Sequence, residues 1–294
     1  MAEGRLSWSV DGSDWPNRQD SAFASAGGLK WHVQRMGAGP KLLLLHGTGA
    51  STHSFRDLAP LLAAEFDVLA PDLPGHGFTG MPDNAGLSLP GMARLVGALI
   101  EALDFRPDIV VGHSAGAAVV IEMTRVGLIA PRVIVSVNGA LVPIRGASLF
   151  SPLAKLLFLN PLVPRLFAWR ALSHDATRRV LDGTGSTIDR RGLDLYQRLF
   201  RSPGHVSATL GMMANWDLHC LQRAMRTLKV PVVLIAARDD KAVPAGDAEA
   251  IAHSTKATSV VMLQRGGHLV HEERPADIAR IVIDAARKHA IPPV

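Results

Sequence analysis

Short runs of apolar residues alternate along the chain with longer segments in which apolar residues recur at helical spacing. A run that is apolar throughout is typical of a strand buried on both faces, as in a parallel sheet covered by helices. We therefore predict strands at residues 41–45, 67–70, 109–111, 133–137, 232–237 and 259–263. We predict helices at residues 54–65, 88–104, 115–125, 245–253 and from Pro275 onward. The pattern indicates an α/β fold with a mostly parallel sheet and helices on both faces.

The interval between residues 143 and 228 departs from this alternation. It contains prolines, glycines and longer helix-like pieces, and the strand pattern resumes only at residue 232. We predict that residues 143–228 form a helical cap inserted between two strands of one sheet. The rest of the chain then divides into an N-terminal extension at residues 1–28 and an α/β core at residues 29–142 and 229–294.

Composition narrows the class of protein. Of the 294 residues, 48% are hydrophobic and 19% are charged, which is typical of a folded chain. Cys220 is the only cysteine, so we expect no intrachain disulfide and no cysteine-based metal site. We find no secretory signal and no apolar stretch of spanning length, and we expect a cytoplasmic protein.

Charge is unevenly distributed. The net charge is +5, yet residues 143–229 contain 13 Lys and Arg against five Asp, a balance of +8 that leaves −3 for the rest. These basic residues are not interleaved with stacking aromatic residues, so we expect no nucleic-acid partner. No phosphate-binding glycine loop and no metal-ligand spacing of histidines is present, so we expect neither a cofactor nor a metal.

One strand-like run leads into Gly112-His113-Ser114-Ala115-Gly116, which fits the G-x-S-x-G pattern. In this pattern a sharp turn between a strand and a helix holds the serine in a strained conformation, and small neighbours allow close packing. A serine hydroxyl is a poor nucleophile at neutral pH and needs a base that removes its proton. Ser114 is therefore our candidate catalytic nucleophile.

The candidate base is His268, which follows two glycines after the last predicted strand. A water-exposed loop histidine is the alternative interpretation of this residue. His271 lies three residues further on and is a weaker candidate, because we expect it to begin the next helix.

The candidate acid follows the strand at residues 232–237. A histidine base needs an acceptor that fixes its tautomer, and both Asp239 and Asp240 stand there. The spacing to Pro244 favours Asp240, with Asp239 as the alternative. The other known place for the acid, after the preceding strand, holds Asn138. The order of nucleophile, acid and histidine along the chain is characteristic of α/β-hydrolases.

An oxyanion needs two backbone N–H donors. Ala115 supplies one from the start of the predicted helix. We expect Thr48 to supply the other, because its glycine neighbours let the backbone approach closely. The neighbours of these donors and of the nucleophile are our expected substrate-contacting residues in the core: His46, Gly47, Gly49 and His113.

These features resemble the α/β-hydrolase superfamily from about residue 29 to the C-terminus, including the DLPGHG segment at residues 72–77. The resemblance implies the α/β-hydrolase fold, with the helical cap inserted after the sixth strand. Haloalkane dehalogenases and epoxide hydrolases attack with an aspartate where this chain has Ser114. The latter also use a pair of cap tyrosines, whereas Tyr196 is the only tyrosine here. A serine hydrolase of ester or related acyl bonds is implied.

Four longer strings resemble the magnesium-chelatase accessory proteins of bacteriochlorophyll biosynthesis. They are DWPNR at 14–18, GGLKWHVQRMG at 27–37, LLLLHGTGAS at 42–51 and SPLAKLLFLNPLVPRLFAW at 151–169. The resemblance implies a role linked to magnesium insertion into protoporphyrin IX, with magnesium chelatase as a partner. It implies no particular reaction, and it suggests a tetrapyrrole-type or other small apolar ester as the substrate.

The apolar segment at residues 150–169 has three interpretations. It can pack on the core, it can form an apolar roof over a flat ligand with Phe158 and Phe167 lining it, or it can lie on a membrane surface. The last interpretation would place the protein peripherally at the inner face of the photosynthetic membrane. A cap histidine, such as His174, His205 or His219, could also ligate a magnesium tetrapyrrole.

Two hypotheses of different classes follow. The first is a serine hydrolase that works through an acyl-Ser114 intermediate. The second is a non-catalytic protein that binds or carries a porphyrin for magnesium chelatase, which the basic and apolar cap favours.

Overall fold

The computed structural model describes residues 4–143, 162–171, 173–255, 257–289 and 291. They form one eight-stranded sheet in the order β1-β2-β4-β3-β5-β6-β7-β8, in which β2 runs antiparallel to both of its neighbours, β1 and β4, and all other neighbouring strands are parallel. The strands are β1 (Ser21–Ala26), β2 (Leu29–Met36), β3 (Lys41–Leu45), β4 (Asp67–Pro71), β5 (Ile109–His113), β6 (Val133–Val137), β7 (Val232–Ala237) and β8 (Thr258–Leu263).

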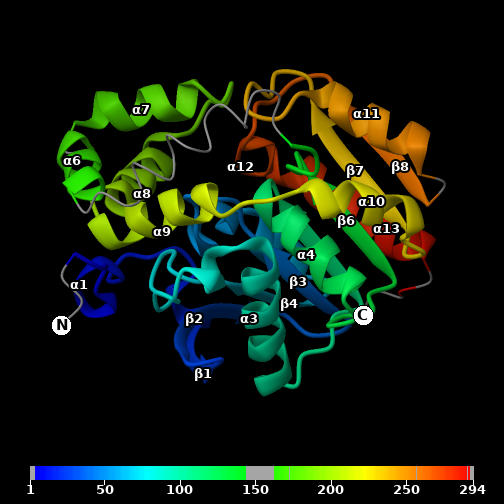
Figure 1. Ribbon diagram of the computed structural model, residues 1–294, viewed down its shortest axis with the longest axis horizontal. Coiled ribbons are helices and arrows are strands. Elements are labelled where there is room, and N and C mark those ends of the chain that lie inside the picture. The colour runs from blue at the N-terminus through cyan, green and yellow to red at the C-terminus, as the bar shows by residue number, and fades with distance from the viewer. Residues whose placement is uncertain (1–3, 144–161, 172, 256, 290, 292–294) are drawn as a thin grey trace.

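Helices cover both faces of this sheet (Figure 1). The helices outside the inserted segment are α1 (Trp8–Asp11), α2 (Leu58–Ala63), α3 (Leu89–Ala102), α4 (Ala115–Arg125), α11 (Ala245–Ser254), α12 (Val270–Glu273) and α13 (Pro275–Lys288). Successive side chains of a strand point to opposite faces. Leu43 and Leu45 of β3 accordingly pack in the core cluster of α3 and α4, while Leu42 and Leu44 pack in the cluster of α2 and α13. Burial on both faces explains the continuous apolar runs of the sequence.

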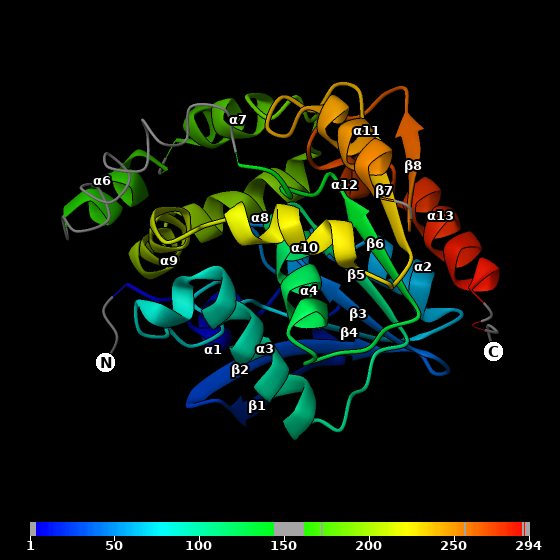
Figure 2. The same ribbon diagram turned by 45° about the vertical axis from the view of Figure 1, so that its right-hand side comes forward.

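A group of helices lies between β6 and β7, above the carboxyl ends of the parallel strands (Figures 1 and 2). They are α6 (Leu162–Arg170), α7 (His174–Asp182), α8 (Arg190–Phe200), α9 (Pro203–Ala214) and α10 (His219–Thr227). The expected fold class, an α/β-hydrolase fold with helices inserted after the sixth strand, is confirmed. None of the described helices has the length and apolar content that a helix needs to cross a bilayer.

Two local expectations differ from the structure. The boundary at residue 28 falls in the turn between β1 and β2, so the sheet begins inside the expected N-terminal extension. β1 is an edge strand of small residues, SAFASA, and carries little apolar signal. The helix expected at 54–65 is divided into a 3₁₀ turn at Thr52–Phe55 and the helix α2. Pro60 explains this, because a proline is tolerated only in the first turn of a helix.

Candidate active site

Ser114 stands in the turn between β5 and α4, with φ +51° and ψ −119°. This is a strained conformation for a residue other than glycine. Gly112 and Gly116 make the turn sterically feasible. A Cβ on Gly112 would lie 2.5 Å from the Ala117 Cα, and one on Gly116 would lie 2.2 Å from the Leu45 carbonyl oxygen. The structure therefore contains the sharp strand-to-helix turn that the G-x-S-x-G pattern predicts.

His268 lies between the serine and an aspartate. Its Nε2 is 2.9 Å from the Ser114 Oγ, and its Nδ1 is 2.8 Å from the Asp240 Oδ2. The Asp240 side chain is fully buried, whereas 11% of the His268 side chain is exposed. The three residues form one hydrogen-bonded chain that ends at the half-buried hydroxyl of Ser114.

The structure distinguishes the two candidate acids. The second carboxylate oxygen of Asp240 accepts hydrogen bonds from the Ala242 and Val243 amides, both at 2.8 Å. These bonds fix the carboxylate so that its other oxygen faces His268. Asp239 is exposed, and its carboxylate accepts a hydrogen bond from the Gly266 amide at 3.1 Å. Asp240 therefore contacts the histidine, as its spacing to Pro244 favours.

The loop after β3 runs directly beside the serine. A Cβ on Gly47 would lie 2.9 Å from both the Ser114 Cβ and the His113 Nδ1, so only glycine fits without displacement. The Thr48 hydroxyl donates to the Met212 Sδ at 3.4 Å. Within the described part of the chain, the amides of Thr48 and Ala115 make no hydrogen bond to a protein acceptor. Both predicted oxyanion donors are thus unengaged.

Two of the expected substrate-contacting residues have buried side chains that support loops. The His46 Nε2 accepts from the Leu73 amide at 2.9 Å, and the His113 Nε2 donates to the His268 carbonyl oxygen at 2.9 Å. Burial lowers the pKa of both imidazoles, so both are neutral. His46 is 0% and His113 is 2% exposed. Their side chains thus hold the backbone around the serine, and their contact with substrate stays a prediction.

The remaining substrate-contacting expectations fall elsewhere. Phe158 lies outside the described residues. Phe167 is half exposed on α6, which lies apart from the start of α4 in both views (Figures 1 and 2). Gly49 lies beside Thr209 and Phe200 of the inserted helices.

Asn138 is a residue whose role the sequence analysis missed. Its Nδ2 donates to the carbonyl oxygens of Gly267 and His268 at 2.9 and 3.0 Å, and its Oδ1 accepts from the Ala237 amide at 2.9 Å. Asn138 thereby joins the end of β7 to the histidine loop. A polar residue placed directly after the buried strand β6 was the available signal.

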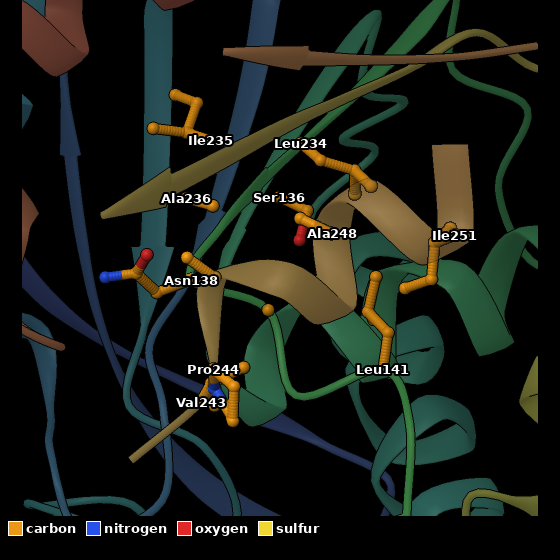
Figure 3. A pocket seen from close by; sticks show the side chains of 12 residues that line it. Ser136, Asn138, Leu141, Leu234, Ile235, Ala236, Val243, Pro244, Ala248 and Ile251 are labelled. Carbon is orange, nitrogen blue, oxygen red and sulfur yellow. The ribbon is translucent and has the colours of Figure 1, made fainter. Parts of the chain in front are cut away.

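A small cavity of about 10 Å³ lies behind Asn138, between β6, β7 and α11 (Figure 3). The Asn138 amide extends away from the Ser136 side chain in this view. The buried hydroxyl of Ser136 lines the cavity and has no partner among the described residues. A space of this size holds about one water molecule, so it is no substrate site.

A turn of the inserted helical segment, Thr184-Gly185-Ser186, touches both loops of the hydrogen-bonded chain. We call it the 184–186 turn. The Thr184 carbonyl oxygen accepts from the amides of Lys241 and His268, at 3.1 and 3.2 Å. The Ser186 Oγ accepts from the Leu269 amide at 2.8 Å. The acid loop and the histidine loop are therefore bonded to the same turn.

A buried ionic cluster lies beneath the histidine loop. Glu272 is fully buried and forms an ion pair with Arg56, and the Tyr196 hydroxyl donates to its carboxylate at 2.7 Å. Burial raises the pKa of Glu272 to about 7. Arg56 also contacts Asp189 at 3.0 Å. Because Tyr196 and Asp189 belong to the inserted segment, the cluster joins that segment to the core.

The described residues contain no group of three His, Cys, Asp or Glu side chains able to hold a metal ion. Of the three cap histidines considered as tetrapyrrole ligands, His174 and His219 are exposed, whereas His205 is 2% exposed. Its Nδ1 accepts from the Gly77 amide and its Nε2 donates to the Gly49 carbonyl oxygen, both at 3.1 Å. Both ring nitrogens are therefore occupied by the protein.

Comparison with known proteins gives concordant matches. A model of the alpha/beta hydrolase family matches residues 42–281. The "Magnesium-chelatase 30 kDa subunit" of Rhodobacter capsulatus is 38% identical over 282 residues, which cover 92% of this chain and 96% of that protein. A solved alpha/beta hydrolase fold protein from Burkholderia ambifaria is 26% identical, with a TM-score of 0.76 over 90% of this chain and 97% of that one. The carbazole-degradation serine hydrolase CarC shares the fold, with 19% identity and a TM-score of 0.75 over 91% and 98% of the two chains.

Proposed function

We propose that this chain, which belongs to the alpha/beta hydrolase family, is a serine hydrolase that cleaves an ester or a related acyl bond. The observation that carries the proposal is the hydrogen-bonded chain from Ser114 through His268 to Asp240. A hydroxyl, an imidazole and a carboxylate in this order are the parts that nucleophilic acyl transfer needs.

The geometry supports a two-step reaction. As the Ser114 Oγ attacks the acyl carbon, the His268 Nε2 accepts the hydroxyl proton, and Asp240 stabilises the imidazolium through Nδ1. The negative oxygen of the tetrahedral intermediate accepts hydrogen bonds from the amides of Thr48 and Ala115. The protonated His268 then gives its proton to the departing alcohol. In the second step His268 takes a proton from the water that attacks the acyl-serine, and it returns this proton to the Ser114 Oγ as the bond to that oxygen breaks and the acid leaves.

The biological context of the proposal comes from the relatives. The Rhodobacter capsulatus relative is named as a magnesium-chelatase subunit. We infer that this chain acts with magnesium chelatase and that its substrate is a tetrapyrrole-type or other small apolar ester. The +8 balance of residues 143–229 favours substrates with anionic groups.

A second candidate function is a non-catalytic porphyrin-binding accessory of magnesium chelatase. The relative's name and the basic inserted segment favour it. The two functions differ in the role of the Ser114 hydroxyl, which hydrolysis requires and porphyrin binding does not.

Labelling with a fluorophosphonate probe separates the two functions, because the probe reacts only with an activated serine. We expect labelling of the wild type and of Ser254→Ala, whose exposed serine ends α11 and serves as the matched control. Labelling should be absent in Ser114→Ala. A wild type that stays unlabelled, while protoporphyrin IX shows a saturable absorbance shift with both wild type and Ser114→Ala, would support the accessory function instead.

A further inference from the structure

The exposed large apolar side chains are concentrated on one helix. The described residues include 11 such side chains, and four of them lie on α6, which is nine residues long. Leu162 and Trp169 are each 64% exposed, Leu166 is 56% exposed and Phe167 is 51% exposed. A surface that merely tolerates apolar residues carries them singly, so a group of four on one helix calls for an explanation.

The amphipathic order of α6 is reversed. Its buried residues are Pro164 and Ala168, four positions apart, and the helix packs on α9. A surface helix ordinarily buries its large apolar residues and exposes its polar ones. Here two of the smallest side chains face the protein and the largest face outward. Packing against the described residues therefore does not explain the sequence of α6.

The outward face of α6 has a defined pattern. At about 100° per residue, Leu162, Leu166 and Trp169 fall within an arc of about 60° on the side opposite to the two buried residues. The same geometry places Arg165 on one side of this apolar stripe and Arg170 on the other. An apolar stripe between rows of basic residues is the pattern of a helix that lies in the interface of a membrane.

The neighbouring helix extends the basic character. Arg178, Arg179 and Val180 of α7 are all exposed. Figures 1 and 2 show α6 and α7 at the outer end of the inserted helices, remote from α13 and the C-terminus. These two helices carry four arginines against two aspartates, Asp175 and Asp182. Their outer surface is therefore both apolar and positive.

We propose that the outer face of α6 and α7 binds the surface of an anionic lipid bilayer. Leu162, Leu166 and Trp169 enter the boundary between headgroups and acyl chains, and the arginines contact the lipid phosphates. A protein partner fits less well, because a stable interface takes about 800 Å² from each side. The nine-residue helix α6, which carries the apolar stripe, is only about 13 Å long.

The test is co-sedimentation of the full chain with vesicles. One set contains equal amounts of phosphatidylglycerol and phosphatidylcholine, and the other contains phosphatidylcholine alone. We expect at least about 10-fold stronger partitioning to the anionic vesicles, and weaker partitioning at high salt, because each arginine near an anionic surface adds to the attraction. Equal partitioning to both sets, or none to either, would overturn the proposal.

Variants locate the binding face. Leu166→Ser combined with Trp169→Ser should lower partitioning about 10-fold without changing the thermal midpoint, because both side chains are exposed. Leu61→Ser combined with Val126→Ser removes two exposed apolar side chains from α2 and the end of α4, and this matched control should bind as the wild type does. Wild-type binding by the α6 variant would contradict the assignment.

A spectroscopic readout completes the test. Vesicles of brominated phosphatidylglycerol should quench part of the tryptophan fluorescence, and Trp169→Phe should bind equally well yet lose that part. Unchanged quenching in Trp169→Phe would overturn the placement of this side chain. A different result would assign this face to a protein partner and also overturn the proposal. In that case the wild type would bind magnesium-chelatase subunits in the absence of lipid, the α6 variant would not, and neither would bind vesicles.

Discussion

The Ser186 Oγ accepts a hydrogen bond from the Leu269 amide at 2.8 Å, although the two residues lie 83 positions apart. Leu269 directly follows His268, so this bond ties the inserted segment to the histidine that contacts Ser114. Ser186 is itself 3% exposed, so no solvent would replace the bond if the hydroxyl were removed. We expect Ser186 to act as a positioning residue for His268.

Ser186→Ala should lower kcat for a p-nitrophenyl ester about 10-fold with little change in KM. The buried Leu269 amide would lose its acceptor, which costs about 1–3 kcal/mol and lets the histidine loop shift. Ser186→Thr keeps the hydroxyl and should restore kcat. Leu62→Ala, which destabilises the core beneath α2, is the control for lost stability. It should leave kcat unchanged well below its unfolding temperature, and an equal fall in kcat would remove the positioning role.

The triad assignment predicts that Ser114→Ala, His268→Ala and Asp240→Asn each lower kcat/KM for such an ester by at least about 10³-fold. The losses should not add in double variants, because the three residues act as one unit. Asp239→Asn is the matched control, because its exposed carboxylate contacts the Gly266 amide. If Asp239→Asn strongly lowered kcat/KM while Asp240→Asn left it unchanged, Asp239 would be the acid instead.

Two substitutions in the loop after β3 test the assignment of the Thr48 amide as an oxyanion donor. Gly47→Ala introduces a Cβ 2.9 Å from the Ser114 Cβ, so the loop and its Thr48 amide must move. Loss of one oxyanion donor lowers kcat by about 10²–10³-fold. Thr48→Ala keeps the backbone amide and should change kcat by less than about threefold. Steady-state kinetics of both variants provide the measurement, and the reverse order of effects would argue for the Thr48 hydroxyl.

The buried Glu272 predicts a pH dependence of stability. Its pKa is raised from 4.5 to about 7 by burial, so between these values the folded state binds more protons than the unfolded state. The free energy of unfolding therefore decreases as pH rises through this window, by at most about 3 kcal/mol. Glu272→Gln lacks the titrating group and should gain stability relative to the wild type over the same window.

Urea unfolding at several pH values measures this difference. Glu122→Gln removes the carboxylate of another ion pair with arginine, that of Arg125 on α4, and serves as the control. If the free energy of unfolding depended on pH in the same way for wild type and Glu272→Gln, Glu272 would not titrate in this window.

Local patterns predicted much of the fold and of the site. Strands buried on both faces are apolar throughout, so β3, β5, β6 and β7 are visible in the sequence. The carboxyl ends of parallel strands meet at one edge of a sheet, so polar residues that follow such strands come together. This is why Ser114, Asp240 and His268 could be proposed as one group before their distances were known.

Other features depend on contacts between distant parts of the chain. Nothing in the local sequence around Ser186 indicates that it bonds to the histidine loop, and the position of Asn138 after β6 indicates its place near the site but not its bonds to that loop. The burial of His46 and His113 follows from the loops that pack over them and not from their neighbours in sequence. β1 was not predicted, because its residues are mostly small and form a strand only by pairing with β2.

The inserted helices are not a detachable module. A Cβ on Gly267 would lie 2.3 Å from the carbonyl carbon of Gly185, so the histidine loop and the 184–186 turn meet backbone to backbone. Removing residues 143–228 would also remove the acceptor of the His268 amide. A truncated protein is therefore no neutral reference for ligand binding. A chimaera that exchanges this segment with a relative would have to bring a turn of the same shape.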